Sequence, residues 1–411
     1  MNTLLAISAL LFTIFLMQAG SGALGPLDAL SAIEMGFTST QIGSIGGAHF
    51  VGFIIGCIIS PALVKRVGHA RAYGVVASLA IMAVILHPVL PYFWAWLMLR
   101  IFNGIAIAGS FTAIESWLNA KLNNQNRVRY FSFYRTIDMV GGLVAQIMII
   151  VLLPAHFVSY TVIAVLICLS LLPLGLTQSV QPQMPKQEKF RPLFAFQISP
   201  LAVIGVVIVG ATSSVIRMIG PLFAYKSELS TTQTGAFLAL FVVGGAVASM
   251  PFGFLTERYS NRQMLATLSL LALICSLAFR FFGDITIGGI PSLFILIFIF
   301  GASTMPLYSL CATHANNLTT QQDMTALSAS LIFFFAGGAI ISPVLAAELI
   351  DWFGPNAMFS YFAGLHALLR LFTLYRSRIR PDVPTTKAYM YIPRTTLFIA
   401  KTIRTLRSRK Q

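Results

Sequence analysis

The sequence predicts an all-α membrane protein with about twelve transmembrane helices in two pseudo-symmetric six-helix bundles. Hydrophobic residues make up 57% of the 411 residues and charged residues only 9%, whereas a soluble domain usually carries about 25% charged residues. The apolar stretches are also long enough to be spans, which need roughly 20 apolar residues each. A soluble fold of this composition would expose a largely apolar surface, so the surrounding solvent must be lipid.

Polar breaks between the apolar runs define the spans and the domains. The first run lacks a basic start and a cleavage site, which favours an uncleaved span over a signal peptide. Residues 178–198 are polar, proline-rich and basic, which predicts a linker between bundles at 1–177 and 199–376, with a basic tail at 377–411. The expected spans are 4–27, 41–63, 70–90, 92–118, 132–153, 156–177, 199–222, 233–254, 263–282, 290–313, 325–349 and 355–376.

The distribution of Lys and Arg predicts the orientation. Alternate connections and the tail carry 22 of these residues, whereas the opposite connections carry only Lys226 together with acids such as Glu348 and Asp351. Because basic residues concentrate in cytoplasmic loops, both termini are expected in the cytoplasm. Most of the net charge of +15 lies in the tail, where we expect contact with anionic lipid rather than nucleic acid.

Short strings recur between the two halves at a nearly constant offset of 192 to 197 residues. They occur in the same order and at corresponding places in the spans. This pattern predicts duplicated halves in the same orientation, a layout found in transporters with parallel repeats. The matches pair Gly25-Pro26-Leu27 with Gly220-Pro221-Leu222, Thr40-Gln41-Ile42-Gly43 with Thr232-Gln233-Thr234-Gly235, Gly52 with Gly244, Arg66 with Arg258, Gly104 with Gly301, and Asn119 with Asn316.

The connection after the eighth span, residues 253–262, resembles the loop signature of the major facilitator superfamily, in which a glycine precedes an acid and several basic residues. Ser260 departs from that signature, where a glycine is usual. The first-half copy, residues 61–71, keeps Gly68 but has Lys65 in place of the acid. The resemblance implies a charge network at the cytoplasmic rim, for which the candidates are Arg66, Glu257 and Arg258.

A second resemblance lies in the fourth span. Residues 99–108 look like the superfamily's fourth-helix pattern, and Glu115-Ser116-Trp117-Leu118-Asn119 resembles the YcaD-like branch of uncharacterised bacterial members. The superfamily resemblance implies two bundles around a central cavity lined by spans one, four, seven and ten. It also implies alternating access in a bacterial inner membrane, with one half rocking against the other.

Polar residues within the spans are the candidate substrate site, because a charge in hydrocarbon is costly unless it is paired or hydrated. Arg100 lies near the middle of span four, and Asn103 shares its face. Arg217 either contacts substrate or a gate, or forms a rim ion pair with Asp28. Two arginines favour an anionic or zwitterionic substrate. The candidate substrate-binding residues are Arg100, Asn103, Arg217, Gln18 and Tyr308.

A further set of charged residues is suited to proton coupling or gating. Asp28 is either a proton carrier near the cavity mouth or a solvated loop carboxylate. Glu115 is expected to pair with a rim arginine and act as a latch. Asp138 follows Arg135 by three residues, which favours an intrahelical pair, with proton transfer as the alternative. The complete set is Asp28, Glu115, Asp138, Arg66, Glu257 and Arg258.

The predicted function is therefore a secondary active transporter of a small solute, with proton coupling and direction left open. No Walker A string, zinc-protease motif or nucleophile elbow occurs, and the four cysteines are widely spaced in apolar stretches. We therefore expect no enzyme activity, cofactor or metal site, and a monomer whose partners are a small molecule and the bilayer. The alternative is a non-transporting receptor on a transporter fold, which a cavity filled with bulky apolar side chains would favour.

Overall fold

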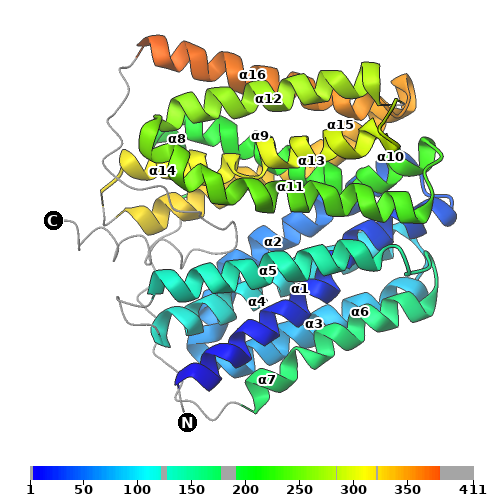
Figure 1. Cartoon of the computed structure of the whole chain (residues 1–411). Coiled ribbons are helices and arrows are strands. Elements are labelled where there is room, and N and C mark those ends of the chain that lie inside the picture. The colour runs from blue at the N-terminus through cyan, green and yellow to red at the C-terminus, as the bar shows by residue number, and fades with distance from the viewer. Residues whose placement is uncertain (1–2, 122–126, 177–190, 284, 321–322, 380–411) are drawn as a thin grey trace.

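The computed structural model describes residues 3–121, 127–176, 191–283, 285–320 and 323–379, and nearly all of them are helical (Figure 1). A short antiparallel hairpin interrupts the helices; its strands, of two residues each, are β1 (Thr286–Ile287) and β2 (Ile290–Pro291). The helices are α1 (Thr3–Glu34), α2 (Ser39–Val67), α3 (His69–Val89), α4 (Phe93–Lys121), α5 (Arg127–Met148), α6 (Phe157–Leu169), α7 (Leu171–Gly175), α8 (Phe194–Ile198), α9 (Pro200–Met218), α10 (Gly220–Lys226), α11 (Thr231–Arg258), α12 (Asn261–Phe282), α13 (Ser292–Thr304), α14 (Leu307–Asn317), α15 (Met324–Phe353) and α16 (Ala357–Ile379).

The twelve predicted spans correspond to these helices. Within the described residues, eleven helical segments are long and apolar enough to cross a membrane. The twelfth is α5, which is 22 residues long and packs beside α1 and α11; it carries Arg135 and Asp138, which lower its hydropathy. Three spans consist of two helices each: α6 with α7, α9 with α10, and α13 with α14.

Most boundaries of the predicted spans shift by a few residues, and two differences affect the candidate site. The first span was expected to end near residue 27, but α1 continues through Pro26 to Glu34. Asp28 therefore belongs to the helix and not to a loop. The seventh span was expected to run without interruption over 199–222, but it breaks at Ile219, between α9 and α10. Pro221 stands in the first turn of α10, where its missing N–H costs nothing.

The repeat in the sequence has a direct structural counterpart. Thr38 and Gln41 form a capping box at the start of α2, and Ser230 and Gln233 form the same box at the start of α11. A side chain at Gly52 would meet the backbone of α4, and one at Gly244 would meet the backbone of α13. Each half therefore brings its second and fourth spans together in the same way.

The two loop motifs turn the chain by different means. Gly68, between α2 and α3, has φ of 85°, a conformation that favours glycine. Ser260, which stands where the superfamily signature has a glycine, instead caps α12 and forms a capping box with Gln263. The departure in the second half thus replaces a glycine turn with a helix cap.

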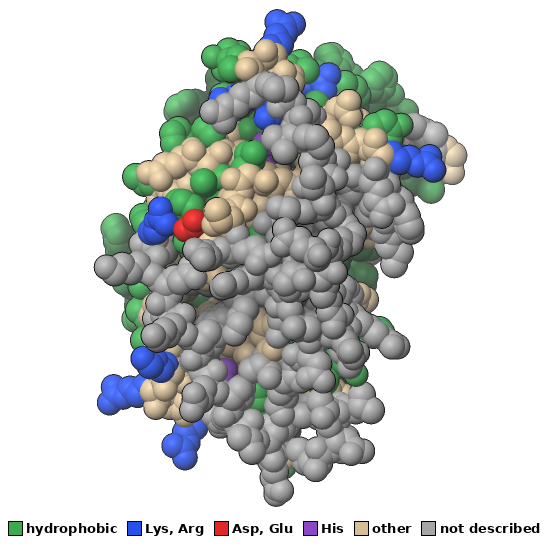
Figure 2. Space-filling view, turned by 90° about the vertical axis from the view of Figure 1, so that its left-hand side faces the viewer, with side chains coloured by type: hydrophobic (Ala, Val, Ile, Leu, Met, Phe, Trp, Pro, Cys, Tyr) green, Lys and Arg blue, Asp and Glu red, His purple; other side chains and the backbone are tan. Residues whose placement is uncertain are grey.

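The N-terminal half and the C-terminal half lie side by side, with α1, α2 and α5 facing α9, α10, α11 and α15 (Figure 1). We call the side where α2 ends (Val67) and α16 ends (Ile379) the termini side, and the side where α2 begins (Ser39) and α15 ends (Phe353) the far side. Figure 2 shows the termini side, where Lys and Arg side chains gather on the described parts. Lys65, Arg66, Arg258 and Arg378 are exposed at helix ends there.

The halves are packed together between the far side and the middle of the molecule. A side chain at Gly43 would meet the backbone at Pro343, and one at Gly47 would meet the backbone at Ile340. These glycines of α2 therefore allow the close approach of α15 from the other half. Phe50, one turn further along α2, has its ring centroid 6.1 Å from that of Phe335.

Candidate functional site

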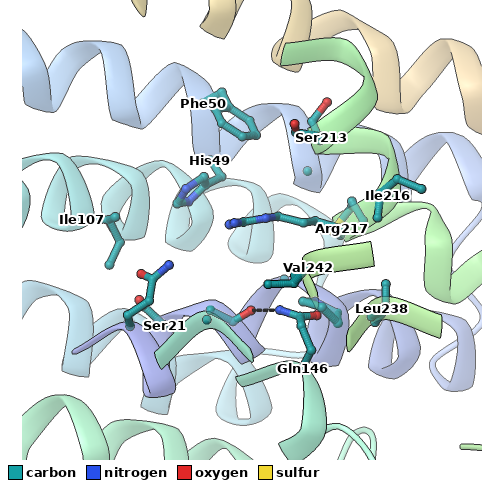
Figure 3. A pocket seen from close by; sticks show the side chains of 18 of the residues that line it. Ser21, His49, Phe50, Ile107, Gln146, Ser213, Ile216, Arg217, Leu238 and Val242 are labelled. Atoms are coloured by element: carbon teal, nitrogen blue, oxygen red, sulfur yellow. Dashed lines mark hydrogen bonds between the residues drawn. The ribbon is translucent and has the colours of Figure 1, made fainter. Parts of the chain in front are cut away.

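A cavity of about 220 Å³ lies between the two halves (Figure 3). It is bounded by α1, α2, α4 and α5 on one side and by α9, α11 and α15 on the other. Of the side chains that line it, thirteen are apolar or aromatic and ten are charged or polar. The charged and polar side chains are those of Gln18, Ser21, His49, Arg100, Arg135, Asp138, Gln146, Ser213, Ser214 and Arg217.

Arg217 extends into this cavity from the end of α9. Its side chain is exposed, although the residues on either side of it are buried. Figure 3 shows its guanidinium pointing toward the ring of His49, which comes from α2 in the other half. Among the described residues no ion pair involves Arg217.

His49 lies opposite Arg217, and its Nδ1 has no hydrogen-bond partner among the described residues. Its ring stands edge-on to Phe50, at 5.2 Å between centroids. The close crossing of α2 and α4 fixes its backbone, since a side chain at Gly104 would overlap the carbonyl group of His49. The backbone of His49 is therefore held in place, its ring interacts with Asn103, and Nδ1 has no partner among the described residues.

Arg135 and Asp138 form a second charged feature of the cavity wall, on α5. Their ion pair joins Nη1 to Oδ2 at 2.8 Å, as the spacing of three residues predicted. The remaining oxygen of Asp138, Oδ1, has no hydrogen-bond partner among the described residues. Asp138 also interacts electrostatically with Arg217 across the cavity, at longer range.

A buried polar cluster lies next to the cavity, between α1, α3, α4 and α6. Asp28 is fully buried, and its Oδ2 is 3.4 Å from Nε2 of His87 and 3.5 Å from Nη1 of Arg100. Its other oxygen, Oδ1, accepts a hydrogen bond of 3.1 Å from the hydroxyl of Tyr160. Arg100 belongs to both features, because it pairs with Asp28 and also lines the cavity.

Neighbouring residues hold His87 firmly in this cluster. Its Nδ1 is 2.6 Å from the carbonyl oxygen of Ala83, one turn earlier in α3. The indole of Trp96 donates to the carbonyl of His87 at 2.9 Å, and the ring of Tyr160 stacks on the imidazole at 5.8 Å. The guanidinium of Arg100 lies beside Gly25, one turn before Asp28, with Nη2 3.7 Å from the Cβ position of that glycine.

Two expectations about Asp28 are wrong. It is not a solvated loop carboxylate, because α1 continues past it and its side chain is buried. It also does not form a rim pair with Arg217; its partners are Arg100, His87 and Tyr160. No sequence pattern singles out His87 or Tyr160, since they come from spans three and six.

The other candidate residues occupy varied positions. Gln18, Arg100, Arg217 and Asp138 line the cavity. Asn103 is buried and is not among the residues that line the cavity, although it stands three residues after Arg100 on the same face of α4. Tyr308 is also buried, and its ring meets that of Phe335 edge-on at 5.8 Å, so it supports a residue of the cavity wall.

The rim candidates lie on the termini side. Glu115 is fully buried and accepts a hydrogen bond of 3.0 Å from the hydroxyl of Tyr134. Arg66 and Arg258 are exposed at the ends of α2 and α11. The side chain of Glu257 lies outside the described residues.

The far side carries polar contacts between the halves that no local sequence pattern predicts. Asp351, at the end of α15, accepts a hydrogen bond of 2.7 Å from Ser39 of α2 and pairs with Lys226 of α10. Glu348 accepts a hydrogen bond from Thr40. From the sequence both acids were only signs of orientation, because their partners lie 125 to 312 residues away.

Comparisons with known proteins identify relatives over nearly the whole chain. The sequence profile of the Major Facilitator Superfamily matches residues 10–204 and again 202–410. The uncharacterized MFS-type transporter YcaD of Escherichia fergusonii is 25% identical over 341 residues, which cover 82% of this chain and 87% of that protein. An uncharacterized MFS-type transporter of Enterobacter sp. (strain 638) is 24% identical over 382 residues, 92% of this chain and 97% of that protein.

Solved structures show the same fold. The nucleoside transporter NupG matches with a TM-score of 0.74 and 15% identity, covering 92% of this chain and 100% of that one. A bacterial homolog to the human lysosomal transporter Spinster, in an inward-facing and unoccupied conformation, matches with a TM-score of 0.70 and 14% identity, covering 98% and 96%. At such identities the likeness concerns the fold alone.

Proposed function

Because the chain belongs to the Major Facilitator Superfamily, within its YcaD-like branch, it is a multi-pass membrane protein of a transporter family, and we propose that it is a proton-coupled secondary transporter. In this proposal it carries a small solute across the bacterial inner membrane by alternating access. The substrate binds in the cavity between the halves, and the proton binds at the buried cluster around Asp28. The observation that carries the proposal is that Arg100 touches both places.

The hydrogen bonding of His87 supports a proton site. Its Nδ1 faces a carbonyl oxygen at 2.6 Å, and a carbonyl can only accept, so this nitrogen carries a hydrogen. In a neutral ring Nε2 would then present a lone pair to Oδ2 of Asp28 at 3.4 Å. Two lone pairs repel at this distance, so one exchangeable proton belongs to the contact, on either the ring or the carboxyl group.

Arg100 connects this proton to the substrate. When the cluster has lost its proton, the Asp28 carboxylate attracts the guanidinium and holds it on the α1 side. When Asp28 is protonated, that attraction weakens and the charge of Arg100 becomes available to a negative group in the cavity. Proton binding and anion binding therefore favour each other, a coupling that a symporter can use.

The contacts between the halves support alternating access. The glycines Gly43 and Gly47 let α2 approach α15 closely, and the polar pairs of Asp351 and Glu348 close the same seam at the far side. Both sets of contacts can separate without burying an unpaired charge, because the polar pairs are partly exposed. In the proposed mechanism they part when the far side opens.

The remaining assignments are proposals of the same kind. We place the termini side, with its basic residues, in the cytoplasm, and the basic tail against anionic lipid. Residues 1–177 and 199–376 would move as two bundles. Arg66, Glu257 and Arg258 would form the charge network at the cytoplasmic rim, and Glu115 would act as a latch near it. Asn103 and Tyr308 would support the site from behind, and the protein would act as a monomer.

Proteoliposomes test the proposal. The purified protein should accumulate small labelled solutes above protein-free vesicles, and an imposed proton gradient should increase that uptake. Uptake driven by sodium alone, or uptake indifferent to both ions, would contradict the proton site. If the protein were a receptor without transport activity, it would bind a solute but take up none. The open cavity with the charge of Arg217 favours the transporter.

A further inference from the structure

The cavity wall carries one positive charge that no described acid pairs with. Four charged side chains line the cavity: Arg100, Arg135, Asp138 and Arg217. Arg100 pairs with Asp28 at 3.5 Å, and Arg135 pairs with Asp138 at 2.8 Å. Arg217 remains: it is attracted by Asp138 and repelled by Arg100 at longer range, but it forms no ion pair with a described acid.

A charge in this position calls for a mobile counter-ion. A guanidinium within a membrane protein is costly unless an anion or water compensates it, and its planar fork matches a carboxylate in a bidentate arrangement. Asp138 cannot supply this match, because its Oδ2 is engaged by Arg135 on its own helix. An anionic substrate would complete the site.

His49 lies where it can bind the same anionic group. Its ring faces Arg217 across the cavity, and its Nδ1 has no hydrogen-bond partner among the described residues (Figure 3). A ring N–H donated from α2 and a guanidinium from α9 would enclose one carboxylate. Since α2 and α9 belong to different halves, the acid group would bridge them, and its presence would favour their approach.

The rest of the wall suits an apolar body. Phenylalanine rings come from α2, α4, α11 and α15, and they are joined by aliphatic side chains such as Ile107 and Leu238. Polar side chains lie among them: Nε2 of Gln146 donates to the carbonyl of Gly22, and its Oε1 has no hydrogen-bond partner among the described residues. The five rings are those of Phe50, Phe53, Phe111, Phe241 and Phe335.

From these observations we infer that the substrate is a small organic monoanion, with one carboxylate or similar acid group bound by Arg217 and His49 and a flat apolar body packed among the phenylalanines. The volume of about 220 Å³ limits that body to a small size, below the roughly 300–1,000 Å³ of pockets for drug-sized ligands. This inference rests on the proposed function, since it names the substrate class of the same cavity.

Equilibrium binding to the purified, detergent-solubilised full-length protein tests the inference without any transport step. The probes are benzoate and 2-naphthoate, each compared with its neutral isostere, benzamide or 2-naphthamide, by calorimetry and by the shift in thermal unfolding temperature. We expect the carboxylates to bind and to stabilise the protein in a concentration-dependent manner, and the amides to bind at least about tenfold more weakly. Equal binding of acid and amide, or no binding of either, would overturn the inference.

Variants connect the binding to the named residues. Arg217→Gln should weaken binding of 2-naphthoate by about tenfold or more, and Arg217→Lys by less, because it keeps the charge but loses the fork. Arg378→Gln, which removes an exposed arginine at the end of α16, is the matched control and should bind as the unmodified protein does. Unchanged binding in Arg217→Gln would contradict the site. If Arg217→Gln does not fold, the comparison of acid and amide in the unmodified protein still tests the inference.

The two proposals fail in different ways. If carboxylates bind but a proton gradient drives no uptake, the substrate class stands and the proton coupling is wrong. If a neutral solute is taken up under a proton gradient and no carboxylate binds, the proposed function stands and the substrate class is wrong.

Discussion

The imidazole of His87 faces the carboxyl group of Asp28 inside the N-terminal half, with Nε2 3.4 Å from Oδ2. Both side chains are fully buried, and they come from α3 and α1. The other ring nitrogen is bound to a carbonyl oxygen and the other carboxyl oxygen to a tyrosine hydroxyl. The contact is therefore surrounded by groups that fix its geometry, and its state of protonation is the variable that remains.

Asp28→Asn should uncouple transport from protons. An amide keeps the shape of the carboxyl group but cannot exchange a proton at this contact, so uptake driven by a proton gradient should be lost. Exchange of labelled for unlabelled substrate at equal pH should continue, since it requires no net proton movement. Both are measured in proteoliposomes. Glu34→Gln is the control, an exposed acid on the same helix, and retention of gradient-driven uptake in Asp28→Asn would remove Asp28 from the mechanism.

Removing Arg100 should destabilise the protein more than removing both members of its pair. Arg100→Gln leaves a buried carboxylate without its cation, which costs about 3–5 kcal/mol for a buried pair. The double variant Asp28→Asn, Arg100→Gln leaves no unpaired charge and should recover part of this loss. Thermal unfolding of the two variants measures the difference. A double variant less stable than Arg100→Gln alone would show that Asp28 does not depend on Arg100.

Arg100→Ala should abolish transport of every substrate that the protein accepts, because this residue connects the proton cluster with the cavity. The assay is uptake into proteoliposomes, normalised to the amount of folded protein. Arg378→Gln serves again as the control for loss of a positive charge. Transport that survives in Arg100→Ala would refute its central role.

The polar contacts at the far side should bias the equilibrium between conformations only slightly. The pair of Lys226 and Asp351 is about one-third exposed on each side chain, and exposed pairs contribute about 0.2–1 kcal/mol. Lys226→Met should therefore raise the far-side-open population by at most about fivefold. Distance measurements between spin labels on α2 and α15 would detect this change. Asp351→Asn should have a larger effect, because it also weakens the hydrogen bond from Ser39.

Adding a methyl group at Gly47 should oppose closure of the far side. Its Cβ would overlap the carbonyl oxygen of Ile340, and overpacking of this kind costs about 1–3 kcal/mol. Gly47→Ala should thus shift the protein toward the far-side-open state, as measured by the accessibility of the cavity to impermeant reagents. Gly337→Ala is the matched control, since nothing lies within 4 Å of its Cβ position. Equal behaviour of the two variants would show that the α2–α15 contact does not close the far side.

The sequence predicted the helices well, because span length and polar breaks are local properties. The repeated strings were recognised as matches between the halves, but only the structure shows that they form capping boxes and close helix crossings. The position of Asp28 was wrong because Pro26 suggested a helix end, and a helix within a membrane protein can continue through proline. His87 and Tyr160 were missed since their importance depends on side-chain direction across three helices, which no local pattern contains.

The helix α2 packs by glycine against two different neighbours. Gly43 and Gly47 admit α15 of the opposite half, whereas Gly52 and Gly56 admit α4 of its own half. A chimera that joins the N-terminal half of one relative to the C-terminal half of another would therefore keep the contact of α2 with α4. It would mismatch the contact of α2 with α15. In families of such sequences, substitutions at Gly43 and Gly47 should co-vary with positions 340 and 343, and a working hybrid should carry α15 together with the α2 it came with.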